Sequence, residues 1–411
     1  RVLLALLAAC LPSAACAAKR RDGYQHSISF LTPQLTPRQF LLISSPLQQR
    51  VSYAQLRNFK SMYDAPKPLI DSGLQEPRGL AFDQERGALY VADYGAKKIF
   101  RYNLYVLDRN RNPETAMLTT DGIRVTILQD VPASWVTVDK SGDVFYTDTD
   151  TNSIGKIPNK TITSLISGVY HAGDLSFLSE MELVKRAQKT QQQLMQGSTD
   201  LIPTDPQVVS TMVHRMYEGV HNSHVSSPGG VVTDDDHVYW TNTQNGMSNG
   251  SVVRGFKEPT LPTGAHLTST FPASAVSNDT RRAYGIAKSR GMVVFSGGDG
   301  SVYGLLEQTG QVTTLSSRMS DPRGLVWDGD QTVFVADQSR DAVWSLPVGR
   351  LSSYTPLDEV VKFQHPYGLA LMTVHDHEMV QGAAAGLRGA GRLCHFWVLA
   401  AALVSAGARW A

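Results

Sequence analysis

The chain has 411 residues, of which 42% are hydrophobic and 18% charged, and its formal net charge is +1 at pH 7. This composition allows a sizeable buried core, and without a basic excess it argues against the positively charged surface that binds nucleic acid. The three cysteines, Cys10, Cys16 and Cys394, lie in terminal segments. We therefore expect a folded region that needs no disulfide.

The N-terminus has the layout of a secretory signal peptide. Arg1 precedes an apolar run over residues 2–11, and small residues then lead to Ala17 and Ala18 before the basic cluster 19–21. This pattern predicts a signal peptide over residues 1–18. An N-terminal extension over residues 19–39 would follow it, and the mature protein would enter the secretory pathway.

A repeated pattern dominates residues 40–372. Residues 76–83 open with Pro and Gly and end at Asp, a second apolar run covers 89–93, and residues 321–328 and 333–337 repeat both segments closely. Such a turn followed by two apolar runs predicts paired strands. A small sheet of this kind cannot bury both of its faces alone, and repetition at roughly 40 residues predicts a β-propeller.

Weaker copies raise the number of blades to six. Three of them open near residues 131, 227 and 284. A sixth opens at residues 365–371, where the repeats stop, and the segment 40–53 resembles the strands that this blade lacks. We therefore predict an all-β, six-bladed propeller in which N- and C-terminal strands share one blade, so that no free sheet edge remains between the first and last blades.

One insertion, over about residues 158–208, enlarges the second blade. A capping box at residues 179–182 and apolar residues at helical spacing predict a helix over about 180–196. Residues 213–220 would return as the outer strand of the blade. The helix is either a solvated decoration or a lid or docking arm for a partner.

The C-terminus has the layout of a signal for a glycolipid (GPI) anchor. After a stalk over 373–382, residues 383–411 contain small residues, a polar spacer and the apolar run 396–407, which is shorter than the roughly 20 residues of a membrane-spanning helix. We expect lipid attachment near Gly382 and an extracellular or cell-surface location. The alternative is a disordered or tail-anchored end. Three glycosylation sequons, at Asn159, Asn249 and Asn278, are consistent with secretion.

The opening turns of the blades predict a ligand site, because in a propeller they form a ring around one mouth of the central channel. The ring residues are Arg78, Ser134, Gly229, Tyr284, Arg323 and Tyr367, and two positions upstream lie Glu76, Asp321 and His365. This mixture of polar and aromatic residues is typical of a binding site for a protein, glycan or small ligand. The alternative is that Glu76 and Asp321 only form local ion pairs with the two arginines.

Other polar groups have structural interpretations. Asp93, Asp148, Asn242 and Asp337 recur at strand ends, where such side chains accept backbone hydrogen bonds. Residues 234–236 are three aspartates without the spacing of an EF-hand, and we expect a solvated hairpin tip. Residues 375–378 contain His, Asp and Glu, which form either a metal site or an exposed linker. No common hydrolase or nucleotide-binding motif is present.

The repeats carry family resemblances. Residues 77–83 with 89–93 resemble the NHL repeat, and residues 238–242 resemble the YWTD repeat of lipoprotein-receptor propellers. Regucalcin and gluconolactonase-like propellers hold a metal through Glu, Asn and Asp around the channel mouth, but here Arg78, Arg323, Tyr284 and Tyr367 occupy the equivalent positions. Peptidyl-hydroxyglycine lyase propellers are similar in repeat style and bind zinc through His, for which only His365 is available here.

We therefore expect a binding module at the channel mouth, with no cofactor. The enzymatic alternative is a lactonase, esterase or lyase that uses Ca²⁺ or Zn²⁺ at the same mouth. A third alternative is a purely architectural spacer or coat component. A fold of this kind hosts all three classes, so the resemblance implies the fold and leaves the function to the site.

Overall fold

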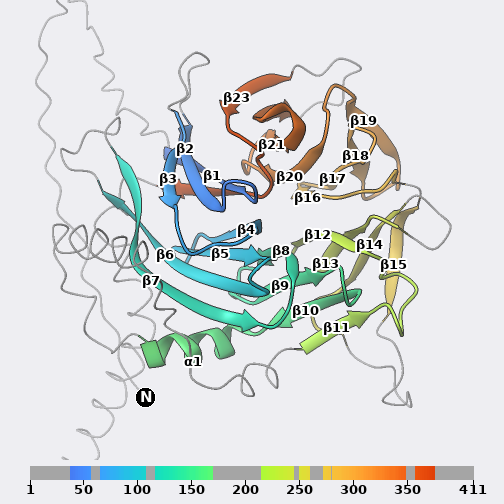
Figure 1. Cartoon of the computed structure of the whole chain (residues 1–411). Helices are drawn as coiled ribbons and strands as arrows, with labels where there is room; N and C mark the ends of the chain where they lie inside the picture. Colours follow the sequence, from blue (N-terminus) through green and yellow to red (C-terminus); the bar gives the residue numbers. More distant parts are fainter. Residues whose placement is uncertain are drawn as a thin grey trace, which may run out of the picture. The chain divides into compact units, whose positions relative to one another are not determined.

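The computed structural model describes residues 38–56, 65–107, 116–169, 214–244, 250–259, 272–278, 280–348 and 357–374. They belong to one compact unit, Pro37–Ala411. These residues form six four-stranded antiparallel sheets, which confirms the predicted six-bladed β-propeller (Figure 1). The expected signal peptide, Gly382, Asn249 and the predicted helix over 180–196 lie outside the described residues. Residues 373 and 374, predicted as the start of the stalk, instead end the last strand of the propeller, and the rest of the stalk lies outside the described residues.

Five blades are continuous in sequence, and their strands run outward from the propeller axis in chain order. The first contains β4 (Pro77–Asp83), β5 (Ala88–Asp93), β6 (Lys98–Leu107) and β7 (Met117–Gln129). The second contains β8 (Ala133–Val138), β9 (Val144–Asp148), β10 (Ser153–Ile157) and β11 (His214–Glu218). The third contains β12 (Pro228–Thr233), β13 (His237–Asn242), β14 (Ser251–Phe256) and β15 (Ala273–Asn278).

The fourth blade contains β16 (Ile286–Ser289), β17 (Met292–Ser296), β18 (Val302–Leu306) and β19 (Val312–Ser316). The fifth contains β20 (Pro322–Trp327), β21 (Thr332–Asp337), β22 (Ala342–Pro347) and β23 (Asp358–Lys362), with the short 3₁₀ helix η2 (Gln338–Arg340) between β21 and β22.

The sixth blade joins the two ends of the repeat region. Its inner strand is β24 (Leu369–Val374), which pairs with β1 (Arg38–Ser45), and β2 (Arg50–Leu56) and β3 (Lys67–Ile70) complete the sheet. Leu41 lies opposite Leu371 and Ile43 opposite Leu369. In Figure 1 the blue strands β1–β3 complete the ring beside the first blade. The predicted closure by N- and C-terminal strands is therefore confirmed, and β3 is an additional strand that the sequence pattern did not predict.

The hydrophobic core consists of six clusters, one for each interface between neighbouring blades. For example, Phe40 of the sixth blade and Leu89 of the first belong to one cluster, whereas Trp240 of the third blade packs with Phe145 of the second. The alternating side chains of each strand therefore face two different neighbours. Because each blade buries its faces only against its neighbours, the ring must close to complete the core.

A helix occupies the start of the insertion in the second blade. It is α1 (Asn159–Val169), which directly follows β10. Ile162 is buried, and Leu165 and Ile166 pack beside it against the first and second blades, at the spacing of one helical face. The outer strand β11 confirms the predicted return of the chain near residue 213. Within the described residues no helix has the length and apolar character needed to span a bilayer.

The recurrent Asp and Asn residues at the ends of the second strands hold the turns around them. Both carboxylate oxygens of Asp93 accept backbone N–H groups, from Gln75 at 2.8 Å and from Glu76 at 2.8 Å. Asp337 does the same for Ser320 and Asp321. Their interpretation as structural residues is confirmed, and through these bonds each of the two carboxylates fixes the turn that carries a mouth arginine.

Candidate functional site

The six opening turns meet at one end of the propeller because each contacts the next blade. The N–H of Gly324 donates to the carbonyl oxygen of Tyr367 at 2.8 Å. A side chain at Gly285 would overlap the Arg323 carbonyl oxygen, and one at Gly79 would lie 2.6 Å from the Cα of Trp135. The glycine that follows each ring residue is therefore required by this close approach. In the second blade Trp135 stands where the other blades have glycine.

Hydroxyl side chains hold the opening turn of one blade to the second strand of the blade before it. Each comes from the second strand of one blade and donates to the carbonyl oxygen of the ring residue in the next. The four bonds are Ser44 Oγ to Arg78 at 2.5 Å, Thr147 Oγ1 to Gly229 at 2.7 Å, Thr241 Oγ1 to Tyr284 at 2.6 Å and Ser296 Oγ to Arg323 at 3.1 Å. The backbone of the mouth is therefore fixed independently of its side chains.

Arg78 is held on all sides. Its Nε and Nη2 donate to one carboxylate oxygen of Glu76 at 2.9 and 2.6 Å, and its Nη1 donates to the Ser134 hydroxyl at 3.2 Å. The guanidinium lies 3.5 Å from the centroid of the Tyr94 ring and 5.9 Å from that of Tyr367. Each guanidinium nitrogen donates a hydrogen bond and two aromatic rings lie nearby, so this arginine is a fixed part of the mouth.

Arg323 is placed in a similar way. Its Nη2 donates to Asp321 at 3.0 Å and its Nε to the amide oxygen of Gln338 at 3.2 Å. Its guanidinium lies 4.1 Å from the centroid of the Tyr284 ring. Burial lowers the pKa of Arg323, but the nearby Tyr367 and Asp321 outweigh this effect and raise the pKa overall, so the side chain stays charged.

Tyr367 lies near both arginines: its ring centroid is 5.9 Å from the Arg78 guanidinium, and its carbonyl oxygen accepts the N–H of Gly324, next to Arg323. Burial raises its pKa, an effect that the positive charges of Arg78 and Arg323 reduce. Its ring stacks against Trp135 with the centroids 5.2 Å apart and the planes tilted by 31°. The phenol therefore keeps its proton at neutral pH.

The structure brings some of the predicted site residues together and leaves others apart. Arg78, Tyr367, Arg323 and Tyr284 form one connected group, and Glu76 and Asp321 form the local ion pairs with arginine that were the alternative interpretation. His365 has a left-handed backbone (φ 49°), and its N–H donates to Asp341. Within the described residues, His365 makes no hydrogen bond, ion pair or ring contact with the arginines or tyrosines of the mouth.

Three residues of the site were not predicted from the sequence: Tyr94, Gln338 and Trp135. Tyr94 and Gln338 occupy the same repeat position, directly after the structural Asp of the second strand, and each contacts the arginine of its own blade. The Tyr94 hydroxyl also donates to Asp150 at 3.0 Å. Aligning the repeats beyond that Asp, and noting the Trp in place of Gly, would have identified all three.

A pocket of about 330 Å³ lies along the propeller axis. Residues of the six inner strands line it, among them Leu80, Trp135, Ile286 and Leu369. Tyr367 does not line this pocket, whereas Trp135, which stacks against it, does. Trp135 therefore lies between the axial pocket and the tyrosine of the channel mouth.

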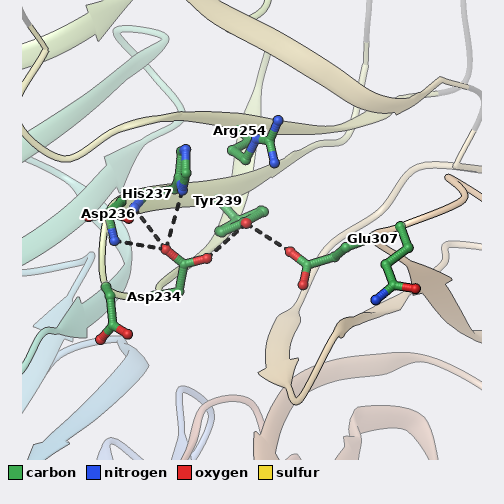
Figure 2. A pocket seen from close by; sticks show the side chains of 8 residues that line it. Asp234, Asp236, His237, Tyr239, Arg254 and Glu307 are labelled. Carbon is green, nitrogen blue, oxygen red and sulfur yellow. Dashed lines mark hydrogen bonds and ion pairs between the residues drawn. The ribbon is translucent and has the colours of Figure 1, made fainter.

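A second pocket, of about 410 Å³, contains the hairpin tip 234–236. Figure 2 shows the Tyr239 hydroxyl between two carboxylates, Asp234 at 2.9 Å and Glu307 at 2.8 Å. Burial raises the pKa of Asp234, but the N–H of His237 and the Tyr239 hydroxyl outweigh it and lower the pKa overall. The tip is thus a hairpin turn as predicted, but Asp234 is partly buried and bonded rather than freely solvated, because it joins the third and fourth blades.

The channel mouth does not fit the metal of lactonase-like propellers. Where such enzymes present carboxylates and amides, this chain has guanidinium groups and phenols, and a guanidinium repels a cation. Within the described residues, no three His, Cys, Asp or Glu side chains are grouped so that they could hold a metal ion. The segment 375–378 lies outside the described residues.

Two of the predicted glycosylation sites lie within the described residues. Asn278 is exposed at the end of β15. Asn159 begins α1, and its side-chain amide donates to the carbonyl oxygen of Ser141 at 2.8 Å. The amide nitrogen to which a glycan would attach is therefore occupied at Asn159.

Solved structures with similarity to this chain include one that supports the fold. A chain of the nidogen/laminin complex aligns with 81% of this chain and 98% of its own length, at 13% identity and a TM-score of 0.51. A gluconolactonase from Xanthomonas campestris aligns with 81% of this chain and 86% of its own, at 11% identity and a TM-score of 0.42. Virginiamycin B lyase from Staphylococcus aureus aligns with 71% and 73%, at 11% identity and a TM-score of 0.38.

No protein-family model matches the sequence, and no curated protein matches it significantly. The chain is a six-bladed β-propeller. Propellers of this architecture include binding proteins as well as lactonases and lyases, so its function has to be argued from its own residues.

Proposed function

We propose that the protein is a secreted, GPI-anchored surface propeller that binds a protein, glycan or small ligand at the channel mouth. The observation that carries this proposal is the convergence of Arg78, Arg323, Tyr284 and Tyr367. They come from four different blades, yet Arg78 lies 5.9 Å from the centroid of the Tyr367 ring and Arg323 lies 4.1 Å from that of Tyr284. The N–H of Gly324, next to Arg323, donates to the Tyr367 carbonyl oxygen. Folding alone does not require charged and aromatic side chains at four separate turns, because glycine and serine occupy the equivalent positions in the other two blades.

The second support is the rigidity of the mouth. The ring residues sit on turns fixed by backbone and hydroxyl bonds to neighbouring blades, such as the bond from Thr241 to the Tyr284 carbonyl oxygen at 2.6 Å. Side chains on such a scaffold lose little conformational entropy when a ligand binds, which favours affinity. The pattern fits recognition at a preformed surface.

The decisive experiment compares ligand capture by matched variants. The secreted protein, with its anchor signal replaced by an affinity tag, is used to isolate its ligand from the surfaces and medium of the source cells. We expect Arg323→Gln to reduce binding of that ligand at least about tenfold. Arg290→Gln removes the same charge from the exposed turn between β16 and β17 and should leave binding unchanged. Equal binding by both variants would contradict the proposal.

The surface location has its own test. Treatment of intact source cells with a phosphatidylinositol-specific phospholipase C should release the protein into the medium, and replacing the small residues around Gly382 should abolish that release. An enzyme that removes N-glycans should reduce the mass of the wild-type protein, with Asn278→Gln lowering the reduction. Retention of the protein inside the cell, without a glycan, would exclude a secretory route.

A further inference from the structure

A buried arginine of the first blade has no counter-ion among the described residues. Arg101 lies on β6 and is 6% exposed, and within the described part of the chain it takes part in no ion pair. Its Nε and Nη1 are buried and make no hydrogen bond. A guanidinium keeps its charge in proteins, and a buried charge without a partner is strongly destabilising. The fold therefore leaves a positive charge that needs to be neutralised.

The Arg101 side chain lies on the face of the first blade that packs against the second. Arg101 is directly opposite Tyr90 on β5 and Val125 on β7, so the three side chains share one face of the sheet. Tyr90 and Val125 belong to the apolar cluster between the two blades. Helix α1 contacts β7 and contributes Ile162 to the same cluster (Figure 1). Bulk water is therefore a poor substitute for the counter-ion at this place.

The carboxylate in this neighbourhood already has a partner. The charges that act on the Tyr90 hydroxyl are those of Arg101, Asp83 and Arg86. Asp83 Oδ2 accepts from Arg86 Nη1 at 3.1 Å, and Asp83 Oδ1 accepts the N–H groups of Glu85 and Arg86, each at 3.1 Å. Asp83 is thus used by Arg86, which leaves the charge of Arg101 as the local excess.

Arg124, in the same blade, shows how a buried arginine is satisfied. It is 4% exposed, its Nη1 donates to the carbonyl oxygen of Gly73 at 2.5 Å, and its guanidinium lies 4.5 Å from the centroid of the Phe100 ring. Within the described residues Arg101 has neither a carbonyl acceptor nor an aromatic ring facing its guanidinium. Its one side-chain partner is the Tyr90 hydroxyl.

The Tyr90 hydroxyl adds a second donor to this place. It accepts a hydrogen bond from Arg101, and within the described residues its own proton has no acceptor. Burial raises the pKa of Tyr90, an effect that the charge of Arg101 reduces, so the hydroxyl keeps its proton at neutral pH. The two side chains therefore offer N–H and O–H donors together with one positive charge.

We propose that Arg101 and the Tyr90 hydroxyl bind a halide ion, chloride under physiological conditions, between the first and second blades. The single negative charge of a halide balances the single unpaired guanidinium, and its spherical shape accepts hydrogen bonds from any direction. A carboxylate or a phosphate would bring further oxygens into an apolar cluster that has no donors for them. The bound ion stabilises the interface between the two blades. This site is separate from the channel mouth, so it does not depend on the proposed function.

The test measures the unfolding temperature of the tag-bearing secreted protein while sodium gluconate is replaced by sodium chloride at constant ionic strength. We expect chloride to raise this temperature by at least about 2 °C, because a ligand that binds only the folded state stabilises it. Bromide should act in the same way. Arg101→Met replaces the buried charge with an apolar side chain of similar length and should lose the halide effect. Tyr90→Phe removes one donor and should weaken the apparent halide affinity several-fold.

Arg124→Met is the matched control, because it removes another buried arginine of the same blade and should retain the halide effect. Equal unfolding temperatures of the wild type in chloride and gluconate would overturn the proposal, and would mean that a carboxylate of the chain neutralises Arg101. A halide effect of unchanged size in Arg101→Met would also overturn it. If Arg101→Met does not fold, wild-type crystals grown in sodium bromide decide: anomalous density beside Arg101 supports the site, and its absence rejects it.

Discussion

The N–H of Gly324 donates to the carbonyl oxygen of Tyr367, so the glycine of one opening turn lies directly against the ring residue of the next blade. A Cβ at Gly324 would overlap that same oxygen. We expect Gly324→Ala to lower the free energy of unfolding by about 2 to 4 kcal/mol. Gly291→Asn is the control, because Gly291 is in an open turn with a positive φ that Asn tolerates. Chemical denaturation measures both, and a similar small effect at the two sites would contradict the packing argument.

Ser44 links both ends of the repeat region to the channel mouth. Its hydroxyl donates to the Arg78 carbonyl oxygen at 2.5 Å and accepts the N–H of Gly368 at 2.8 Å. Ser44→Ala leaves both buried backbone groups without this partner, which should cost about 1 to 3 kcal/mol of unfolding free energy. Ser339→Ala, at an exposed position in η2, should change the stability by less than about 0.5 kcal/mol. Equal unfolding free energies for the two variants would show that the closure does not depend on Ser44.

Substitution of Arg78 should mainly affect the stability of the fold, whereas substitution of Arg323 should mainly affect ligand binding. Arg78→Gln breaks the contacts with Glu76 and Ser134 and removes the cation from the Tyr94 ring, so we expect a loss of about 1 to 3 kcal/mol in unfolding free energy. Arg323→Gln should cost less stability, because the Arg323 guanidinium lies farther from the Tyr284 ring (4.1 Å) than that of Arg78 does from the Tyr94 ring (3.5 Å), but it should cost more ligand affinity. Denaturation and titration of the two single variants measure both quantities. If Arg323→Gln is less stable than Arg78→Gln and binds the ligand normally, Arg323 rather than Arg78 is the residue that mainly stabilises the fold.

Tyr239 provides a test of pH dependence away from the mouth. Because the folded protein lowers the pKa of Asp234, the ionised carboxylate stabilises the fold at pH values above its usual pKa, and this contribution is lost as the pH falls through the folded pKa. Tyr239→Phe removes the hydroxyl that helps to lower this pKa. We expect the variant to be less stable by about 1 kcal/mol at pH 7, with a smaller difference near pH 3.

Denaturation at both pH values measures this difference between Tyr239→Phe and the wild type. Asp236→Asn is the control, since Asp236 is exposed and only its backbone N–H bonds to Asp234. A difference that grows as the solution is acidified would show that the Tyr239 hydroxyl does not favour the ionised form of Asp234.

The repeat pattern was sufficient to predict the blades and their closure, because the opening turn and the first two strands depend on local features such as Pro, Gly and buried apolar runs. Outer strands were harder to predict. β15 and β19 are partly exposed and rich in Ser and Thr, so they lack the apolar alternation that identifies a strand. Similarly, α1 has no acidic first turn and no capping box, and its apolar face is short.

The candidate site was predictable only in part. Its ring residues followed from their place in the repeat, but their relations did not, because the contact between Arg78 and Tyr367 joins residues from blades at opposite ends of the chain. Gln338, which accepts a hydrogen bond from Arg323, was missed because its correspondence to Tyr94 appears only when the repeats are aligned beyond the structural Asp. Trp135 was a signal that the sequence analysis missed. It replaces the repeat glycine and lies between the axial pocket and Tyr367.

The central claim is that ligand binds at the channel mouth, and site-specific photo-cross-linking tests it most directly. A benzophenone amino acid is placed at Ser339, exposed beside Gln338 at the mouth, or at Arg290, exposed at the opposite end of β16. The account predicts a cross-link to the captured ligand from position 339 and none from position 290, with the first lost in Arg323→Gln. A cross-link from position 290 alone would contradict it.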